Sequence, residues 1–203
     1  MIELIAFLGN PGPEYAKNRH NAGRLLAESL PFASALIWQK KHQGLYAALD
    51  PALLPPPAAP SSGRRSDPIR LLMPETYMNR SGESVLAAAS FFKIPPERIL
   101  AVHDELELPL GTAACKFSGG LGGHNGLRSL RACFGTADFW RLRLGIGRPN
   151  HRDISGWVLS DFTPAERDLL DQVLSVAAAA LLQALDQGPE TLLPEWNKKL
   201  IAR

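Results

Sequence analysis

The sequence predicts an α/β protein, a single-domain three-layer sandwich in which a twisted, mixed β-sheet is flanked by helices. Short apolar runs alternate along the chain with segments of helical spacing. Residues 36–49 and 69–73 follow one another with no helix between them, as an antiparallel pair of strands does. A chain of 203 residues is long enough to bury one sizeable core, so we expect one domain over residues 1–203.

The first strand is expected over the apolar residues 2–8, and the loop Gly9-Asn10-Pro11-Gly12-Pro13 ends it. Two glycines and two prolines in five residues can neither continue a strand nor start a helix. Loops at the carboxyl end of a strand are where an α/β sheet usually places its ligand site. Polar side chains follow this loop, and a helix is expected from residue 22 onward because the apolar positions take helical spacing.

The middle of the chain is predicted to start with a strand over residues 36–49, irregular at Lys40-Lys41-His42. Residues 50–68 contain six prolines and a Ser-Ser-Gly, so we expect a mobile loop or hairpin extension outside the core. A strand resumes at residues 69–73. A helix should then run from residue 81 to residue 93, where the following Pro95-Pro96 ends it.

Two further strands are expected at residues 98–102 and 112–117. The first should end at His103-Asp104-Glu105, and the second runs into a glycine-rich loop that precedes a short helix marked by Leu127, Leu130 and Phe134. Both place polar residues at the end of a strand.

The last third should begin with a strand at residues 140–146, where arginines alternate with apolar residues as on a strand with one wet face. A long helix is predicted over residues 164–187, with proline at its start and Gly188-Pro189 as its stop. A final short helix is expected within residues 190–201.

The bulk composition is that of a soluble globular protein, at 45% hydrophobic and 21% charged. No run approaches the roughly 20 apolar residues of a membrane helix, and Glu3 does not suit a signal peptide. We therefore expect a cytoplasmic protein without membrane contact. Cys115 and Cys133 should be reduced there, and the histidines lack metal-ligand spacing, so no metal site is expected.

Charge is unevenly distributed although the net charge is only +2. Residues 116–152 hold seven basic residues and one acid, whereas residues 153–195 hold eight acids and one base. A basic middle beside an acidic C-terminal third suits a protein that meets a polyanion on one face. An uneven but merely solvated surface is the alternative, and the clustering alone does not decide between them.

Polar residues suited to chemistry lie where predicted strands give way to loops: Asn10 with His20, Asn79, Asp104 and Asn125. A histidine and a carboxylate can form a general base, and asparagine amides can hold a carbonyl or a developing oxyanion. No G-x-S-x-G elbow is present, so water is the simplest nucleophile. Each residue also has a structural alternative, such as a solvated histidine or an asparagine in a cap or turn.

Five strings together resemble bacterial peptidyl-tRNA hydrolase: F-L-G-N-P-G-x-x-Y (7–15), R-H-N-x-G (19–23), P-E-T-Y-M-N-x-S-G (74–82), V-H-D-E-L-E-L-P-L-G (102–111) and G-G-L-G-G-H-N-G-L (119–127). The resemblance implies an esterase that cleaves the bond between a stalled peptide and the ribose of its tRNA. It also implies a monomeric α/β protein without a metal or other cofactor, whose partner is the acceptor arm of peptidyl-tRNA.

The resemblance further implies roles for individual residues. His20 matches the family's catalytic base, Asp104 its orienting carboxylate, and Asn10 the asparagine linked to recognising a blocked aminoacyl group. The positions that match substrate contacts are Tyr15, Tyr77, Met78, Asn79 and Asn125. Lys116 and Arg143 match basic residues assigned to tRNA phosphate.

The chain departs from the family pattern at Asn18, where threonine is usual, at Met73, and at Ser118, which replaces the first of three glycines. Its proline-rich segment 50–68 is longer than the usual hairpin. None of these changes removes a catalytic group. Two other functions stay open at this point: an RNA-binding module that has lost catalysis, and an unrelated hydrolase of small esters.

Overall fold

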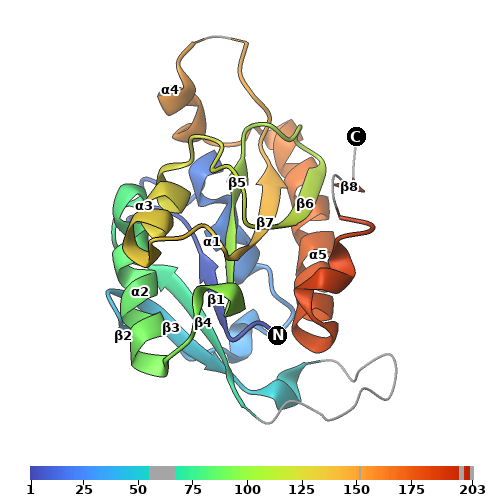
Figure 1. Cartoon of the computed structure of the whole chain (residues 1–203). Coiled ribbons are helices and arrows are strands. Elements are labelled where there is room, and N and C mark those ends of the chain that lie inside the picture. Colours follow the sequence, from blue (N-terminus) through green and yellow to red (C-terminus); the bar gives the residue numbers. More distant parts are fainter. Residues whose placement is uncertain (55–66, 151, 197–198, 202–203) are drawn as a thin grey trace.

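The computed structural model describes residues 1–54, 67–150, 152–196 and 199–201, and shows helices on both faces of a central sheet (Figure 1). The strands are β1 (Leu4–Phe7), β2 (Gln39–Lys41), β3 (Gly44–Leu49), β4 (Ile69–Pro74), β5 (Ile99–Glu105), β6 (Thr112–Phe117), β7 (Trp140–Gly145) and β8 (Lys199–Leu200). The α-helices are α1 (Ala22–Glu28), α2 (Ser81–Phe92), α3 (Asn125–Phe134), α4 (Ile154–Val158) and α5 (Pro164–Gln187). The predicted mixed α/β sandwich is confirmed.

The strands of the described residues form one sheet in the order β2-β3-β4-β1-β5-β7-β6-β8. The four central strands β4, β1, β5 and β7 are parallel, while β3 and β6 run antiparallel to their central neighbours. The expected antiparallel pairing of residues 36–49 with residues 69–73 is therefore confirmed for β3 and β4. The carboxyl ends of the parallel strands meet at one edge, where such sheets bind ligands.

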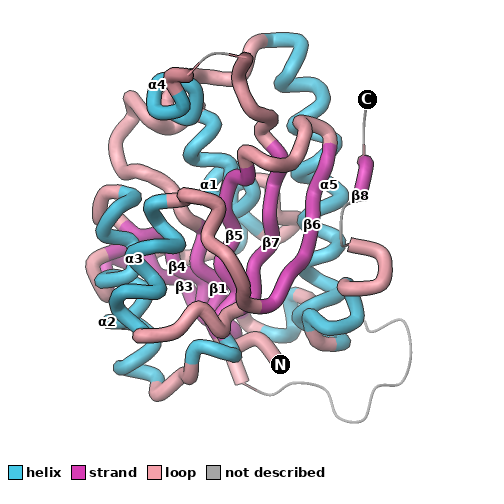
Figure 2. Tube along the Cα trace, turned by 45° about the horizontal axis from the view of Figure 1, so that its top comes forward, coloured by secondary structure: helices cyan, strands magenta, loops and turns pink. Residues whose placement is uncertain are grey.

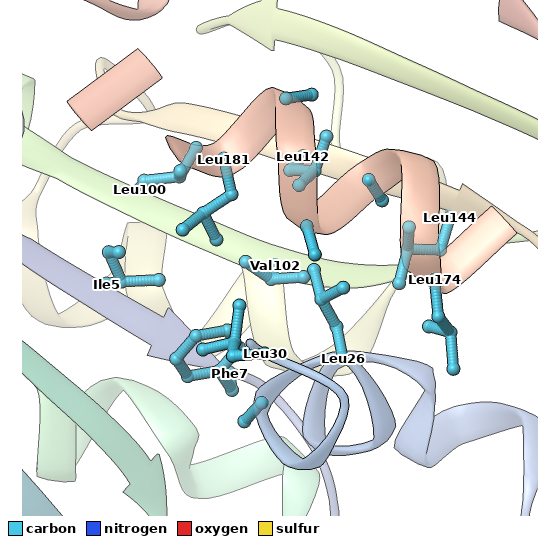
Figure 3. Packing of buried hydrophobic residues seen from close by; sticks show 14 of the residues in the cluster. Ile5, Phe7, Leu26, Leu30, Leu100, Val102, Leu142, Leu144, Leu174 and Leu181 are labelled. Carbon is cyan, nitrogen blue, oxygen red and sulfur yellow. The ribbon is translucent and has the colours of Figure 1, made fainter. Parts of the chain in front are cut away.

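Helices cover both faces of the sheet (Figure 2). A hydrophobic cluster packs on each face. On one face, α1 and α5 cover the strands, and Phe7, Val102 and Leu142 meet Leu26 and Leu181 there (Figure 3). On the other face, α2 and α3 supply the cover. Helix α5 begins and ends where the sequence predicts, and Thr163 and Glu166 form a capping box at its start.

Helix α5 corrects the expectation that no run of the chain approaches a membrane span. By length and composition alone it could cross a bilayer. Its apolar side instead packs on the sheet, and residues such as Leu170, Val173 and Leu181 are fully buried. A buried core helix accounts for this hydropathy.

Three predicted elements differ in the structure. Strand β5 continues to Glu105 because β7 supplies partners for His103, Asp104 and Glu105. Residues 36–49 form two strands, β2 and β3, joined by a turn at His42 and Gln43. The predicted final helix is wrong, since a 3-10 turn at Pro189–Leu192 precedes the short strand β8, which pairs with the edge of β6.

The face of β7 that was expected to be wet is only partly so. Arg141 is 2% exposed, and its guanidinium donates to the backbone carbonyls of Gly119 and Gly120. Arg143 is half-buried. The arginines of β7 therefore lie on a face of the sheet that the glycine-rich loop covers. Of the proline-rich segment 50–68, most lies outside the described residues.

Candidate active site

His20 lies in a 3-10 turn, Arg19–Asn21, that connects the glycine-proline loop to α1. The neighbouring Arg19 fixes this turn: its guanidinium donates to Glu166 Oε2 at 2.8 Å and stacks 3.8 Å from the Trp157 ring. Gly23 allows α1 to approach the sheet, because a Cβ there would lie 2.5 Å from the carbonyl oxygen of Val102. The histidine is thereby held against the end of β5.

Asp104 accepts hydrogen bonds from two histidines at a single oxygen. His20 Nδ1 and His124 Nε2 each lie 2.9 Å from Asp104 Oδ1, and all three side chains are largely buried. The opposite nitrogen of His124, Nδ1, accepts from the backbone N–H groups of Gly126 and Leu127 at the start of α3. His124 is therefore a neutral imidazole that carries its proton on Nε2.

The same reasoning fixes the tautomer of neutral His20. The ionised Asp104 can only accept, so Nδ1 of His20 carries a proton and Nε2 retains its lone pair. His20, Asp104, His124 and Asn125 line a cavity of about 250 Å³, together with the glycine loop and α4. An imidazole with a free ring nitrogen at a cavity, held by a carboxylate, is the arrangement of a general base.

The electrostatics of the pair favour its charged forms. Burial by itself would raise the pKa of Asp104, yet the charge of His20 when it is protonated, and the hydrogen bonds from His20 and His124, hold it well below its usual range. Burial lowers the pKa of His20, but the charge of Asp104 and its hydrogen bond outweigh this and raise it above 6.5. His20 is thus a stronger base than a free histidine.

His103 lies behind this pair and was not singled out by the sequence. It is 1% exposed, its Nδ1 donates to the carbonyl oxygen of Asp104 at 2.6 Å, and its ring packs 4.8 Å from that of His124. Burial keeps its pKa well below the usual value. It is a neutral residue that supports the backbone of Asp104.

The three groups His20, Asp104 and His124 also form a set of metal-ligand type, with their donor atoms within 4.8 Å of one another. Sequence spacing gave no sign of this set, because its members come from three separate segments. The two ring nitrogens that face Asp104 already donate protons to it. An ion would have to replace those protons.

Asn10 has a structural role beside the site. Its Oδ1 accepts from the backbone N–H of Met78 at 2.7 Å, and its backbone exchanges two hydrogen bonds with the Asn21 amide. The Met78 donor requires oxygen at this position, so the Asn10 NH₂ group remains available as a donor. Asn10 thereby joins the loop after β1 to the loop after β4.

We expect Asn10→Ala to destabilise the protein by about 1–3 kcal/mol, because it leaves the buried Met78 N–H without a partner. Chemical denaturation would measure this. Asn79→Ala is the matched control: the side chain is exposed, and such changes usually stay within about 0.5 kcal/mol. Equal stability of the two variants would contradict the proposed role of Asn10.

The remaining predicted residues divide into those near the cavity and those apart from it. Asn125 lines the cavity, whereas Asn10 and Asn79 do not. Tyr15 is half-buried, and Tyr77 is 58% exposed beside a second pocket. The expected convergence of all the polar loops on one cavity is therefore seen for His20, Asp104 and Asn125.

Lys116 and Arg143 lie on the same face of the sheet, since Lys116 pairs with Arg141 and Ala114 pairs with Arg143. Arg143 Nε is 3.0 Å from Glu105 Oε2, and Glu105 lines the cavity. Burial and the charges of Arg143 and Arg141 lower the pKa of Lys116. Ser118 adopts φ 56° and bonds Asp138 Oδ1, so the departure at this position is accommodated in the left-handed region.

Sequence reasoning missed His124 and the cover provided by α4. His124 stands in the string G-G-L-G-G-H-N-G-L, but its two partners become visible only when α3 and β5 are brought together. Helix α4 contributes Ile154, Ser155 and Val158 to the cavity from a stretch of five residues, too short for a periodic signal.

We expect His124→Ala to cost about 0.5–2 kcal/mol of stability, because α3 loses the acceptor at its N-cap. Turnover should also fall, by less than for His20, because Asp104 loses one donor. His124→Asn separates the two effects, since asparagine caps helices well but does not reproduce the imidazole that donates to Asp104. Stability should recover in this variant and turnover should not. Recovery of both would mean that His124 only caps α3 and does not assist Asp104.

Comparison with known proteins places the chain in one family. The family described as peptidyl-tRNA hydrolase matches residues 4–203. Peptidyl-tRNA hydrolases of Pseudomonas paraeruginosa and Treponema pallidum are 43% and 45% identical, and each alignment covers 98% of this chain and 94% or 96% of the relative. A crystal structure of peptidyl-tRNA hydrolase from Acinetobacter baumannii superposes with a TM-score of 0.80 at 37% identity, covering 94% of this chain and 92% of that one. The chain belongs to the peptidyl-tRNA hydrolase family.

Proposed function

We propose that the protein hydrolyses the ester that joins a peptide to the terminal ribose of tRNA, and so recycles tRNA from peptidyl-tRNAs released by stalled ribosomes. Membership of the family supports the substrate class. The observation that carries the chemistry is the 2.9 Å hydrogen bond between His20 Nδ1 and Asp104 Oδ1, which leaves Nε2 of a buried imidazole as the acceptor at the cavity.

The reaction starts when neutral His20 takes a proton from water at Nε2 and the hydroxide oxygen bonds to the ester carbonyl carbon. Asp104 stabilises the imidazolium that forms. The Asn125 amide, at the cavity wall, donates to the oxyanion. When the tetrahedral intermediate collapses, the bond to the ribose oxygen breaks and His20 returns its proton to that oxygen. The tRNA regains its hydroxyl, and the peptide leaves as a carboxylic acid that loses its remaining proton to solvent and becomes a carboxylate.

The tRNA is held, in this proposal, by the basic face of β6 and β7. Arg143 bonds Glu105, which lines the cavity, and Lys116 lies on the same face of the sheet, so phosphates bound there would set the acceptor arm next to His20. Arg143 is bonded to Glu105 through Nε, and part of this interaction is lost when the guanidinium binds a phosphate. Phosphate contacts supply affinity and carry its salt dependence.

We expect Lys116→Gln and Arg143→Gln each to weaken tRNA binding and to reduce the slope of log K against log salt by roughly one unit. Fluorescence anisotropy with uncharged tRNA across a range of salt concentrations measures this. Arg167→Gln on α5, on the opposite face of the sheet, is the matched control. Loss of both basic residues with an unchanged slope would contradict this anchoring.

Two other functions predict different results in one experiment. An RNA-binding module would bind peptidyl-tRNA without cleaving it, and a small-ester hydrolase would cleave simple esters without inhibition by excess uncharged tRNA. We expect the purified protein to release peptide from peptidyl-tRNA and to be inhibited by uncharged tRNA. The buried base with its orienting carboxylate favours the enzyme, because binding alone needs neither.

The protein is further proposed to act as a cytoplasmic monomer of one domain, without membrane contact or cofactor. The packing of the apolar side of α5 on the sheet supports the absence of membrane contact. Size-exclusion chromatography with light scattering would test the monomer, and activity after EDTA treatment would test independence from a metal.

A further inference from the structure

We propose that a basic pocket beside Tyr77 receives the peptide portion of the substrate and favours acidic side chains close to the ester. This inference rests on the proposed function. The pocket has a volume of about 560 Å³ and lies between the turn that joins β2 to β3 and the segment after β4, with Tyr77 and Arg80 in its wall.

The pocket carries unneutralised positive charge. Lys40 and Lys41 are exposed in its wall, and within the described residues neither forms an ion pair. Arg80 adds a third cation, although it pairs with Glu83 at 2.8 Å, and Glu75 is the one acid in the lining. An anionic group is therefore the ligand that this pocket attracts.

The wall of the pocket is formed in advance. His42 and Gln43, the two residues of the turn, have φ of 54° and 55°, a left-handed conformation that is unfavourable for residues other than glycine. The structure holds them there: Ser84 Oγ donates to the His42 carbonyl at 2.7 Å, and the Glu75 N–H donates to the Gln43 carbonyl at 2.9 Å. The two residues close the hairpin between Lys41 and Gly44, a two-residue turn that takes positive φ at both positions, so this wall of the pocket is preorganised.

A short backbone path joins the pocket to the catalytic loops. Tyr77 lies in its wall, and the next residue, Met78, donates its N–H to Asn10 Oδ1. Asn10 in turn bonds Asn21, the residue after His20, so a chain that leaves an ester at His20 and follows this path past Tyr77 reaches Lys40 and Lys41.

The order of the strands separates this pocket from the proposed RNA face. β2 and β3 lie on one side of β1 and β5, whereas β6 and β7 lie on the other (Figure 1). β2 and β6 are six strands apart, a distance of roughly 29 Å at the usual spacing. The substrate is a linear chain of RNA, ester and peptide. With RNA on β6 and β7 and the ester at His20, the peptide extends toward β3 and β2.

The test compares two peptidyl-tRNAs with the same tRNA and the same ester-linked residue, one with aspartate and one with lysine in the adjoining peptide positions. We expect kcat/KM to be roughly two- to five-fold higher for the aspartate substrate, the size of an exposed ion pair. Lys40→Gln with Lys41→Gln should abolish this ratio, and Lys40→Glu with Lys41→Glu should reverse it. Affinity for uncharged tRNA should stay unchanged in both double variants.

Three results would overturn the inference. If the wild-type protein hydrolyses both substrates at equal rates, it has no charge preference, although the proposed hydrolysis of peptidyl-tRNA is unaffected by this result. A uniform loss on both substrates, accompanied by weaker binding of uncharged tRNA, would assign the lysines to phosphate. If the glutamine double variant unfolds at the wild-type temperature and keeps the wild-type ratio of kcat/KM between the two substrates, the peptide does not bind in this pocket. Failure to hydrolyse either substrate would instead overturn the proposed function.

Discussion

Replacing His20 by alanine is expected to lower kcat on peptidyl-tRNA by about 10²–10⁴-fold, the usual contribution of a general base. The buried imidazole is the group at the cavity whose Nε2 can take a proton from water while Asp104 holds Nδ1. Affinity for uncharged tRNA should change little, because Lys116 and Arg143 lie on β6 and β7, whereas His20 lies in the turn before α1. Single-turnover hydrolysis and tRNA titration measure the two quantities separately.

His20→Gln provides the control for folding, since its side chain keeps a polar group near Asp104 while lacking a basic nitrogen. It should unfold near the wild-type temperature and show the same loss of kcat. Wild-type turnover in either variant would show that another group deprotonates the water.

Asp104→Asn should lower kcat by a comparable factor, up to about 10⁴-fold, which is the cost of the same substitution in the serine-protease triad. Removing the negative charge withdraws the interaction that raises the pKa of His20, so burial alone remains and lowers that pKa. The acid limb of the pH–rate profile should therefore move to lower pH even as the plateau falls. A loss of activity caused by misfolding alone would not move the limb.

Asp171→Asn is the matched control for the charge, because Asp171 is an exposed residue of α5. Its kcat and pH profile should equal those of wild type. If Asp104→Asn lowers activity but leaves the acid limb of the pH–rate profile at the wild-type pH, then Asp104 orients His20 without changing its pKa.

Most of the fold follows from the sequence, since strands and helices with clear periodicity keep their places. Helix α5 keeps its predicted bounds because a proline marks its start and Gly188-Pro189 its end. The failures have tertiary causes. Asp104 lies within β5 because β7 extends the ladder beside it, and residues 199–200 form a strand because the edge of β6 is available.

The site was predicted unevenly for the same reason. His20 and Asp104 stand out as polar residues after apolar runs, a local signal. The role of His124 depends on its side chain bridging α3 and β5. The burial of Arg141 depends on carbonyl groups of the glycine-rich loop. Neither contact can be predicted from the spacing of residues in the sequence. Asn79 shows the opposite case: it follows a strand as the other site residues do, yet lies outside the cavity.

The catalytic assignment is tested most directly by titrating the His20 ring by NMR and comparing its pKa with the acid limb of kcat/KM, which reports the free enzyme. The His20→Gln spectrum identifies the signal, since His124 lies only 4.9 Å away between ring centroids. The two pKa values should coincide above 6.5, because Asp104 stabilises the imidazolium. A kcat/KM that stays constant while the His20 ring protonates would contradict general-base catalysis by this residue.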